Sequence, residues 1–84
     1  MNKTDPAYSA EFFRDNLKEL LAHRHIRQKD LAAMMDVAPP IINNWLVGRC
    51  EPTMYSFIRL CNTLNVTPDW FLRENKFVYF EEEE

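Results

Sequence analysis

The stretch from Leu31 to Gly48, LAAMMDVAPPIINNWLVG, constrains the fold of this chain more than any other. Its apolar residues recur at helical spacing up to Met35, and a second set at spacings of three and four begins at Ile42. Asp36 separates the two sets, and the second set ends at Gly48, the only glycine in 84 residues. Two short amphipathic helices joined this closely must cross steeply, so the pattern predicts that the outer face of the second helix is free.

The overall composition predicts one small soluble domain built of helices. A chain of 84 residues with 46% apolar and 27% charged residues is ordinary for a single globular domain. The single glycine and the lack of β-branched runs before the C-terminal segment favour helices over sheet. The apolar runs are too short to span a membrane and the N-terminus lacks the apolar core of a signal peptide, so we expect a cytoplasmic protein.

The formal net charge of −3 is a property of the C-terminal end and not of the whole chain. Four of the thirteen acidic residues form the run Glu81 to Glu84, and without that run ten basic residues stand against nine acidic ones. The rest of the chain is therefore close to neutral. Binding to nucleic acid must depend on where individual charges are placed, because the chain has no strong overall positive field.

The residues that most often carry chemistry are few in this sequence. Cys50 and Cys61 are too few for a disulfide framework, so we expect reduced thiols. His23 and His25 are expected two apart on a helix, facing different ways, so no metal site is predicted. We find no nucleophile–base pair and no glycine-rich phosphate loop. The sequence therefore predicts no enzyme, no cofactor and no small-molecule ligand.

Helix start signals divide the chain into five predicted helices. Asp5-Pro6 and Ser9 are both candidate starts for the first helix, which runs to about Arg24. The second helix spans roughly Gln28 to Met35. Asp36 after it occupies a turn position that suits a left-handed backbone, which aspartate tolerates better than most residues.

The remaining three helices carry similar signals. Pro39 and Pro40 begin the third helix, because the first helical turn needs no backbone donors. Thr53 caps the fourth helix, Asn65 ends it, and Thr67-Pro68 begins a short fifth one. The predicted apolar residues of the last two helices are Met54, Phe57, Ile58, Cys61, Leu64, Trp70, Phe71 and Leu72.

The chain changes character after Asn75, where an aromatic segment with strand propensity leads into the four glutamates. That segment contains Phe77, Val78, Tyr79 and Phe80. Because a lone strand is not stable by itself, it must either pack across the helices or pair with a second copy. We divide the chain into an N-terminal arm or first-helix extension (1–10), a helical domain (11–75) and an extended aromatic strand with an acidic tail (76–84).

In their order and spacing, these residues resemble the Cro/repressor-type (XRE-like) helix-turn-helix family, from about Phe13 to Leu72. The residues that carry the resemblance are Gln28, Leu31, Ala32, Val37, Ile42, Trp45, Gly48, Arg49, Pro52 and the run LCNTLNVTPDWFL from Leu60 to Leu72. The resemblance implies an all-α, five-helix, lambda-repressor-like fold with a short extended C-terminal segment. It also implies a regulator of transcription that binds double-stranded DNA, in the first place a small homodimeric repressor of phage or bacterial type.

The resemblance also implies roles for single residues. Gln28 matches the family glutamine that contacts a DNA phosphate at the start of the second helix, and helix N-terminal amides reinforce such a contact. Arg49 matches a frequent phosphate neighbour, and we add Arg27 and Lys29 as candidate phosphate contacts. The third helix corresponds to the recognition helix of the major groove. The base-reading positions of the family fall on Pro39, Pro40, Ile41 and Asn44.

The outer face of the third helix is unusually apolar for a helix that reads bases. Pro40 and Ile41 can contact a thymine methyl group but offer no hydrogen bonds. Only Asn43 and Asn44 can make polar base contacts, and asparagine suits adenine bidentately. We therefore expect a preference for half-sites that contain A·T pairs, with Asn44 on adenine.

One paired departure from the family pattern is compatible with the fold. Many members bury an arginine of the first helix against a glutamate of the third, and the matching residues here are Leu21 and Leu46. Replacing both partners of a buried ion pair by a fitted apolar pair can be neutral, whereas losing one partner is costly. The sequence therefore predicts contact between Leu21 and Leu46, with neither side chain in solvent.

Two alternatives stay open from the sequence. Phe71 together with the segment 77–80 either packs within the chain or forms a dimer surface. We favour the dimer because a palindromic operator needs two recognition helices, and because exposed aromatic residues usually mark an interface. The second alternative concerns function. The neutral body, the apolar recognition helix and the acidic tail also suit a protein-interaction module on the same fold with weak or no specific DNA binding.

Overall fold

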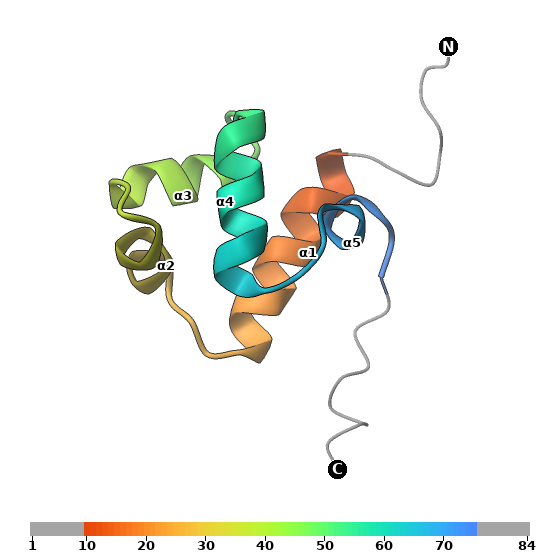
Figure 1. Ribbon diagram of the computed structural model, residues 1–84, viewed down its shortest axis with the longest axis horizontal. Coiled ribbons are helices and arrows are strands. Elements are labelled where there is room, and N and C mark those ends of the chain that lie inside the picture. The colour runs from red at the N-terminus through yellow and green to blue at the C-terminus, as the bar shows by residue number, and fades with distance from the viewer. Residues whose placement is uncertain (1–9, 76–84) are drawn as a thin grey trace.

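The computed structural model of the protein describes residues 10–75 and confirms the all-α fold. Figure 1 shows the five helices, which are α1 (Ala10–His23), α2 (Gln28–Met35), α3 (Pro39–Val47), α4 (Met54–Leu64) and α5 (Pro68–Leu72). The candidate helix starts Asp5-Pro6 and Ser9 lie outside the described residues, as does the segment 76–84. None of the helices within residues 10–75 is long and apolar enough to cross a membrane.

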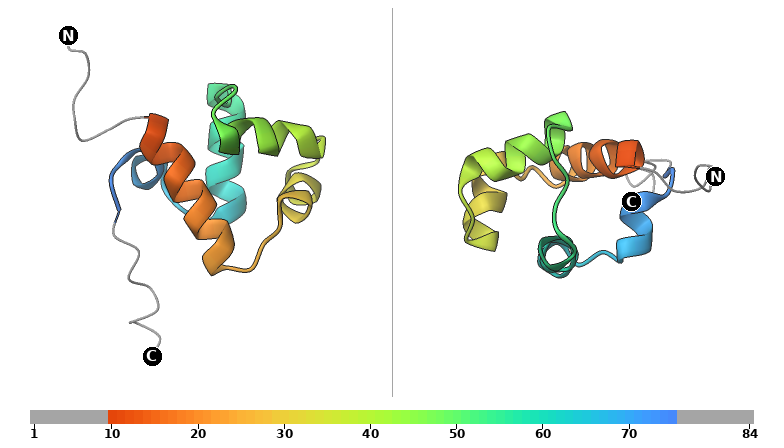
Figure 2. Two further views of the ribbon diagram at one scale, coloured as in Figure 1. Left: turned by 180° about the vertical axis from the view of Figure 1, so that it is seen from behind. Right: turned by 90° about the horizontal axis from the view of Figure 1, so that it is seen from above.

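The helices surround one apolar core, with the helix-turn-helix pair at one end. α2 contacts both α3 and α4, and α1 contacts both α3 and α5. In Figure 1, α4 crosses in front of α1 and α3, and Figure 2, which includes a view from behind, shows α5 at the end opposite α2. Among residues 10–75, this arrangement leaves one side of α3 without a covering helix, as the short connection between α2 and α3 predicts.

All five helices contribute buried side chains to this core. The buried apolar residues are Phe13, Leu17, Leu20, Leu21, Leu31, Ala32, Met35, Ile42, Trp45, Leu60, Cys61, Leu64 and Phe71. The rings of Phe13, Phe57 and Phe71 contact one another with centroids 5.5–5.8 Å apart. Aromatic pairs at such distances stabilise a core beyond their buried area, so α1, α4 and α5 are firmly joined.

Leu21 and Leu46 both belong to this packing. Leu21 is buried, and Leu46 is half-buried against the core cluster, on two helices that contact each other. Neither side chain points to solvent, so the observation that would have refuted the predicted apolar pair does not occur.

The predicted apolar stripe of α4 is wrong at two positions. Met54 is 81% exposed and Ile58 41% exposed, whereas Leu60, which the prediction omitted, is fully buried. The stripe that packs inward is 57, 60, 61 and 64, with the spacing of one helix face. Ile58 lies about 100° around the helix from Phe57 and so leaves this face.

Phe71 is a core residue and does not form part of a dimer surface. Its side chain is fully buried against Phe13 and Phe57, because α5 lies across the end of α1. The dimer interpretation is therefore wrong for Phe71. For Phe77, Val78, Tyr79 and Phe80 it lies outside the described residues.

The helix ends follow the local signals of the sequence. Asp36, Asn65 and Gly48 have positive φ angles of 59°, 60° and 81°, which confirms the left-handed residue predicted after α2 and the predicted ends of α3 and α4. The side chains of Thr53 and Thr67 accept hydrogen bonds from Ser56 and Trp70, as N-caps do.

Three features of the helix ends were not predicted. His25 is not on a helix with His23: α1 ends at His23, and His25 takes a left-handed backbone in the connection to α2. Asn16, buried in α1, donates through Nδ2 to the carbonyl oxygens of Phe71 and Arg73 at 2.8 and 2.7 Å and so fixes the end of α5. Arg59 of α4 donates to the carbonyl oxygen of Met35 at the end of α2.

Candidate nucleic-acid interface

The two faces of α3 differ in burial. Ile42 and Trp45 are buried at 0% and 3% exposure. On the other side, Pro40 and Ile41 are exposed and Asn44 is half-buried. Asn43 is half-buried at the edge of the same side, and Pro39 is exposed at the start of the helix. The structure therefore places all the predicted base-contact residues on the surface of α3, on the side that is accessible to the major groove of DNA.

The N-terminus of α2 is exposed beside its connection to α1. Gln28 is the first residue of α2, and its side chain and that of Lys29 are exposed. The first turn of a helix also presents backbone N–H groups that the helix does not use, and such groups bind phosphate. Gln28 and Lys29 thus have the surroundings that a phosphate contact requires.

Arg27 differs from its neighbours because it pairs with an acid. Its Nε lies 3.0 Å from Asp30 Oδ2, and its backbone N–H donates to the same oxygen at 3.2 Å. The Arg27 side chain, and then its backbone N–H, hold the pKa of the Asp30 carboxyl below its usual value. Asp30 therefore caps α2 in place of the missing N-cap acceptor, and it offsets part of the positive charge of Arg27.

Arg49 and Asn44 are brought together at the other end of α3. The backbone N–H of Arg49 donates to the carbonyl oxygen of Asn44 at 2.9 Å, and Arg49 Nη1 donates to Asn44 Oδ1 at 2.5 Å. Gly48, between them, turns the chain with its φ of 81°, above the side chain of Arg14. The sequence predicted separate roles for Arg49 on phosphate and Asn44 on a base, and no pattern in it indicated their contact.

The comparison with protein families agrees with this geometry. A helix-turn-helix family model, HTH_3, matches residues 17–71, from the second turn of α1 to α5. The chain belongs to this helix-turn-helix family. The resemblance to Cro/repressor-type domains is thereby confirmed, and membership supports a DNA-binding regulator in general terms. Comparisons with curated proteins and with solved structures found no match.

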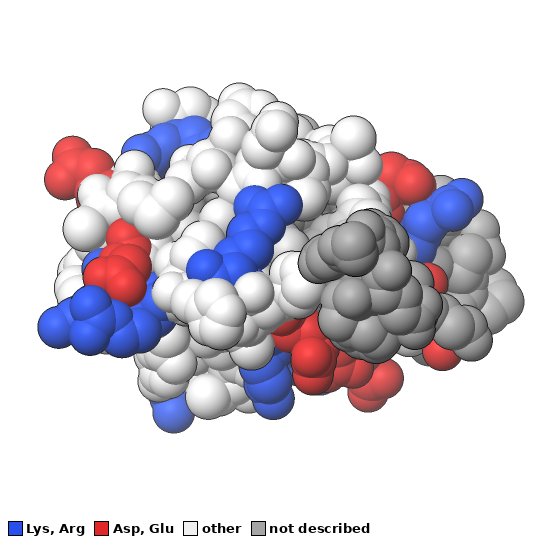
Figure 3. Space-filling view, turned by 90° about the horizontal axis from the view of Figure 1, so that it is seen from below, with Lys and Arg blue, Asp and Glu red and all other residues white. Residues whose placement is uncertain are grey.

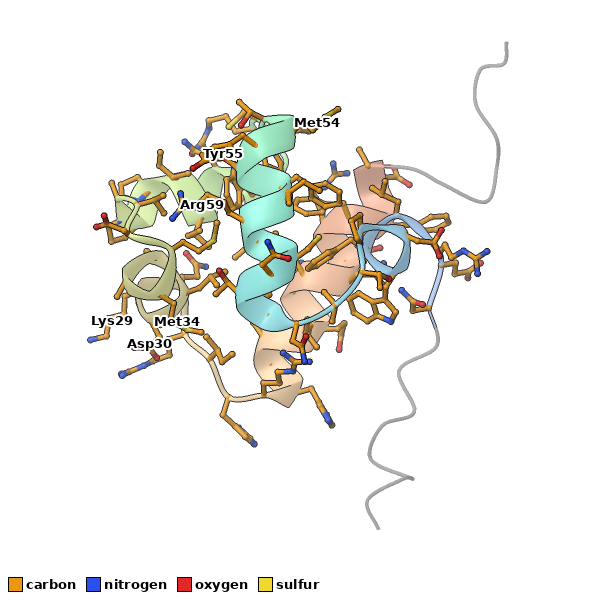
Figure 4. The ribbon with its side chains drawn as sticks, in the orientation of Figure 1. Lys29, Asp30, Met34, Met54, Tyr55 and Arg59 are labelled. Atoms are coloured by element: carbon orange, nitrogen blue, oxygen red, sulfur yellow. The ribbon has the colours of Figure 1, made fainter. Side chains whose placement is uncertain are left out.

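The surface of this helix-turn-helix domain is not uniformly basic. Figure 3, a view from below, shows basic side chains spread among uncharged ones, with acidic side chains on the same face. In Figure 4, Lys29 and Asp30 extend outward together from α2, so one basic and one acidic side chain stand beside each other. Local placement of charge, and not an overall field, is what this helix-turn-helix domain can offer to DNA.

A second surface of the helix-turn-helix domain is apolar and was not predicted. Met54 and Tyr55 at the start of α4 are 81% and 74% exposed, and Met34 of α2 is 52% exposed. Figure 4 shows Tyr55 and Arg59 extending from α4 toward α2 and α3, and the Arg59 guanidinium lies 5.8 Å from the Tyr55 ring centroid. Met34 lies apart from Met54 (Figure 4), so we name only Met54, Tyr55 and Ile58 the α4 apolar surface.

Proposed function

We propose that this helix-turn-helix protein is a sequence-specific DNA-binding regulator of transcription, a small cytoplasmic repressor of phage or bacterial type. The observation that carries the proposal is the two-sided burial of α3. Ile42 and Trp45 fix the helix to the core, while Pro40, Ile41 and Asn44 stay at the surface. A helix held in this way can enter the major groove by its N-terminal part.

Contacts to the phosphates position the domain on the duplex in this proposal. Gln28 and Lys29 contact one phosphate region together with the N-terminal amides of α2, and Arg27 adds the charge that Asp30 leaves it. Arg49 lies at the opposite end of the helix-turn-helix unit, so its remaining guanidinium N–H groups reach a separate phosphate. Two contact regions fix both the position and the tilt of α3.

Contacts to bases supply the specificity. Pro40 and Ile41 present apolar surface to the methyl group of thymine, and Asn43 and Asn44 present side-chain amides to base edges. Two copies of the protein, joined through the aromatic segment 77–80, would place two such helices on a palindromic operator about one helical turn apart.

A binding selection tests this proposal directly. The purified full-length protein is incubated with a random DNA library at 50 and 200 mM salt, and the bound duplexes are sequenced. We expect an enriched palindrome at both salt concentrations, with affinity that falls steeply as salt rises. The matched control is Asn43→Ala with Asn44→Ala, which removes both polar base contacts while leaving Gln28 and Lys29 in place. Failure of the wild-type protein to enrich any sequence would refute the proposal.

A protein-interaction module on the same fold is the second candidate function. The observation that favours it is the α4 apolar surface, because exposed apolar patches mark contact sites for other proteins. The selection separates the two functions: an interaction module returns no enriched sequence and retains no DNA at 200 mM salt.

A further inference from the structure

The turn after α3 returns the chain onto the helix that it has just left. Gly48 adopts φ 81°, and the backbone N–H of Arg49 then donates to the carbonyl oxygen of Asn44 at 2.9 Å. A Cβ atom at residue 48 would lie 3.1 Å from Cδ and Nε of Arg14, so α1 supports this turn from below. The position of Arg49 beside Asn44 is therefore set by the backbone.

The side chains of these two residues make a second connection. Arg49 Nη1 donates to Asn44 Oδ1 at 2.5 Å, while Arg49 itself remains exposed and Asn44 is half-buried on the outer side of α3. Because the guanidinium binds the carbonyl end of the amide, the orientation of the amide is fixed. Oδ1 keeps a second lone pair, but that lone pair lies beside the guanidinium charge, so the NH₂ end is the part that meets a further acceptor.

We propose that Arg49 is a positioning residue that determines specificity, by making Asn44 a hydrogen-bond donor toward DNA. At the base pair that faces Asn44, the protein then prefers guanine to adenine. This inference rests on the proposed function, because it concerns the base that the recognition helix reads. It replaces the sequence-based expectation that Asn44 reads adenine.

The chemistry of the major groove gives the reason for this preference. An asparagine that reads adenine must accept from the N6 amino group through Oδ1 and donate to N7 through Nδ2. Here Oδ1 accepts from a cationic group, which also repels the partly positive N6 amino group. Guanine presents two acceptors, N7 and O6, and both suit an NH₂ donor beside a positive charge.

The inference is tested by the base preference of single variants at the position that Asn44 faces. The random-library selection is run with the full-length wild type, Arg49→Met and Asn44→Ala. We expect guanine at this position in the wild type. Arg49→Met frees Oδ1, and we expect the guanine-to-adenine preference there to change by about tenfold toward adenine. Asn44→Ala should abolish the preference at that position, whether or not Arg49 is also replaced.

Three results would overturn the inference. If Arg49→Met lowers binding to all sequences equally, Arg49 is only a phosphate contact. If Asn44→Ala keeps the guanine preference, Arg49 reads guanine itself. If the wild type selects adenine there, the amide is not restricted to donation. Lys29→Met is the matched control, because it also removes one exposed cation but leaves Asn44 untouched, and it should lower affinity without changing the selected sequence.

A second measurement needs no DNA and separates this inference from the proposed function. In ¹H–¹⁵N spectra of the free protein, we expect Arg49→Met to move the side-chain NH₂ signals of Asn44 while leaving those of Asn43 in place. Unchanged Asn44 signals, in a protein that still selects a DNA sequence, would overturn the Arg49–Asn44 contact and leave the proposed function standing. A protein that selects no sequence overturns both.

Discussion

The inner and outer faces of α3 differ in burial and in residue composition, although both belong to one helix of nine residues. The inner face is apolar and anchored: Ile42 is fully buried, and Trp45 is nearly so. The outer face combines two prolines, an exposed isoleucine and two asparagines, and no charged residue lies within the helix. Packing determines the first face, whereas in the proposed function DNA is the partner of the second. Substitutions on the two faces should therefore affect different measurements.

The largest expected effect comes from neighbouring isoleucines on opposite faces. Ile42→Ala should lower the free energy of unfolding by about 3 kcal/mol, because it leaves a cavity in the core. Ile41→Ala, the matched control at an exposed position, should change it by less than about 0.5 kcal/mol. Urea unfolding followed by circular dichroism measures both. Equal losses for the two variants would show that the faces are not distinct.

A substitution of Gly48 tests the turn that connects the end of α3 to Arg49. Gly48→Ala should cost about 1–2 kcal/mol of unfolding free energy, because alanine resists the left-handed backbone. The new Cβ also approaches Arg14 at 3.1 Å. Combining the change with Arg14→Ala relieves this contact alone, so part of the loss should be recovered. A Gly48→Ala protein as stable as the wild type would contradict the geometry of the turn.

Substitutions of Gln28 and Lys29 at the N-terminus of α2 should change DNA binding in two different ways. Gln28→Ala should weaken DNA binding about fivefold through the loss of one hydrogen bond, with the salt dependence unchanged. Lys29→Met should reduce the slope of log affinity against log salt by about one, because one phosphate is no longer neutralised. Fluorescence anisotropy at several salt concentrations measures both. If Gln28→Ala changes the slope and Lys29→Met does not, these roles are wrong.

The smallest expected effect concerns Asp30. Asp30→Asn removes the carboxylate that pairs with Arg27 and should raise DNA affinity about twofold, since more of the Arg27 charge faces phosphate. Glu19→Gln, an exposed acid on α1, is the control. The pKa of the Asp30 carboxyl is lower in the folded protein than in the unfolded chain. The ion pair with Arg27 therefore contributes to the free energy of unfolding above the unfolded-state pKa, and this contribution is lost as the pH falls through the folded-state pKa. Weaker DNA binding by Asp30→Asn would contradict this interpretation.

The sequence predicted those parts of the fold that local chemistry determines. Asp36, Gly48 and Asn65 end their helices as predicted, because the left-handed backbone favours glycine, aspartate and asparagine regardless of the surroundings. Thr53 and Thr67 cap their helices for a similarly local reason. The apolar spacing within α3 correctly predicted that Ile42 and Trp45 are buried, whereas Leu46, predicted on the same face, is half-buried.

The predictions that failed concern features that depend on residues far apart in the sequence. In α4, Ile58 and Leu60 are both apolar, so spacing alone did not show which one faces the core. Phe71 is buried only because α5 lies across α1, and Asn16 binds carbonyl oxygens more than fifty residues away. The bond from Arg49 to Asn44 depends on how one turn directs a long side chain, which residue type does not determine.

Binding of a selected duplex to the wild type and to an outer-face variant tests the central claim most directly. The variant is Ile41→Ser with Asn44→Ala, and its unfolding by urea is measured in parallel. We expect the wild type to prefer the selected duplex to a scrambled one, and the variant to bind both duplexes equally while unfolding at an unchanged urea concentration. A variant that retains the wild-type preference would show that the outer face of α3 does not read DNA.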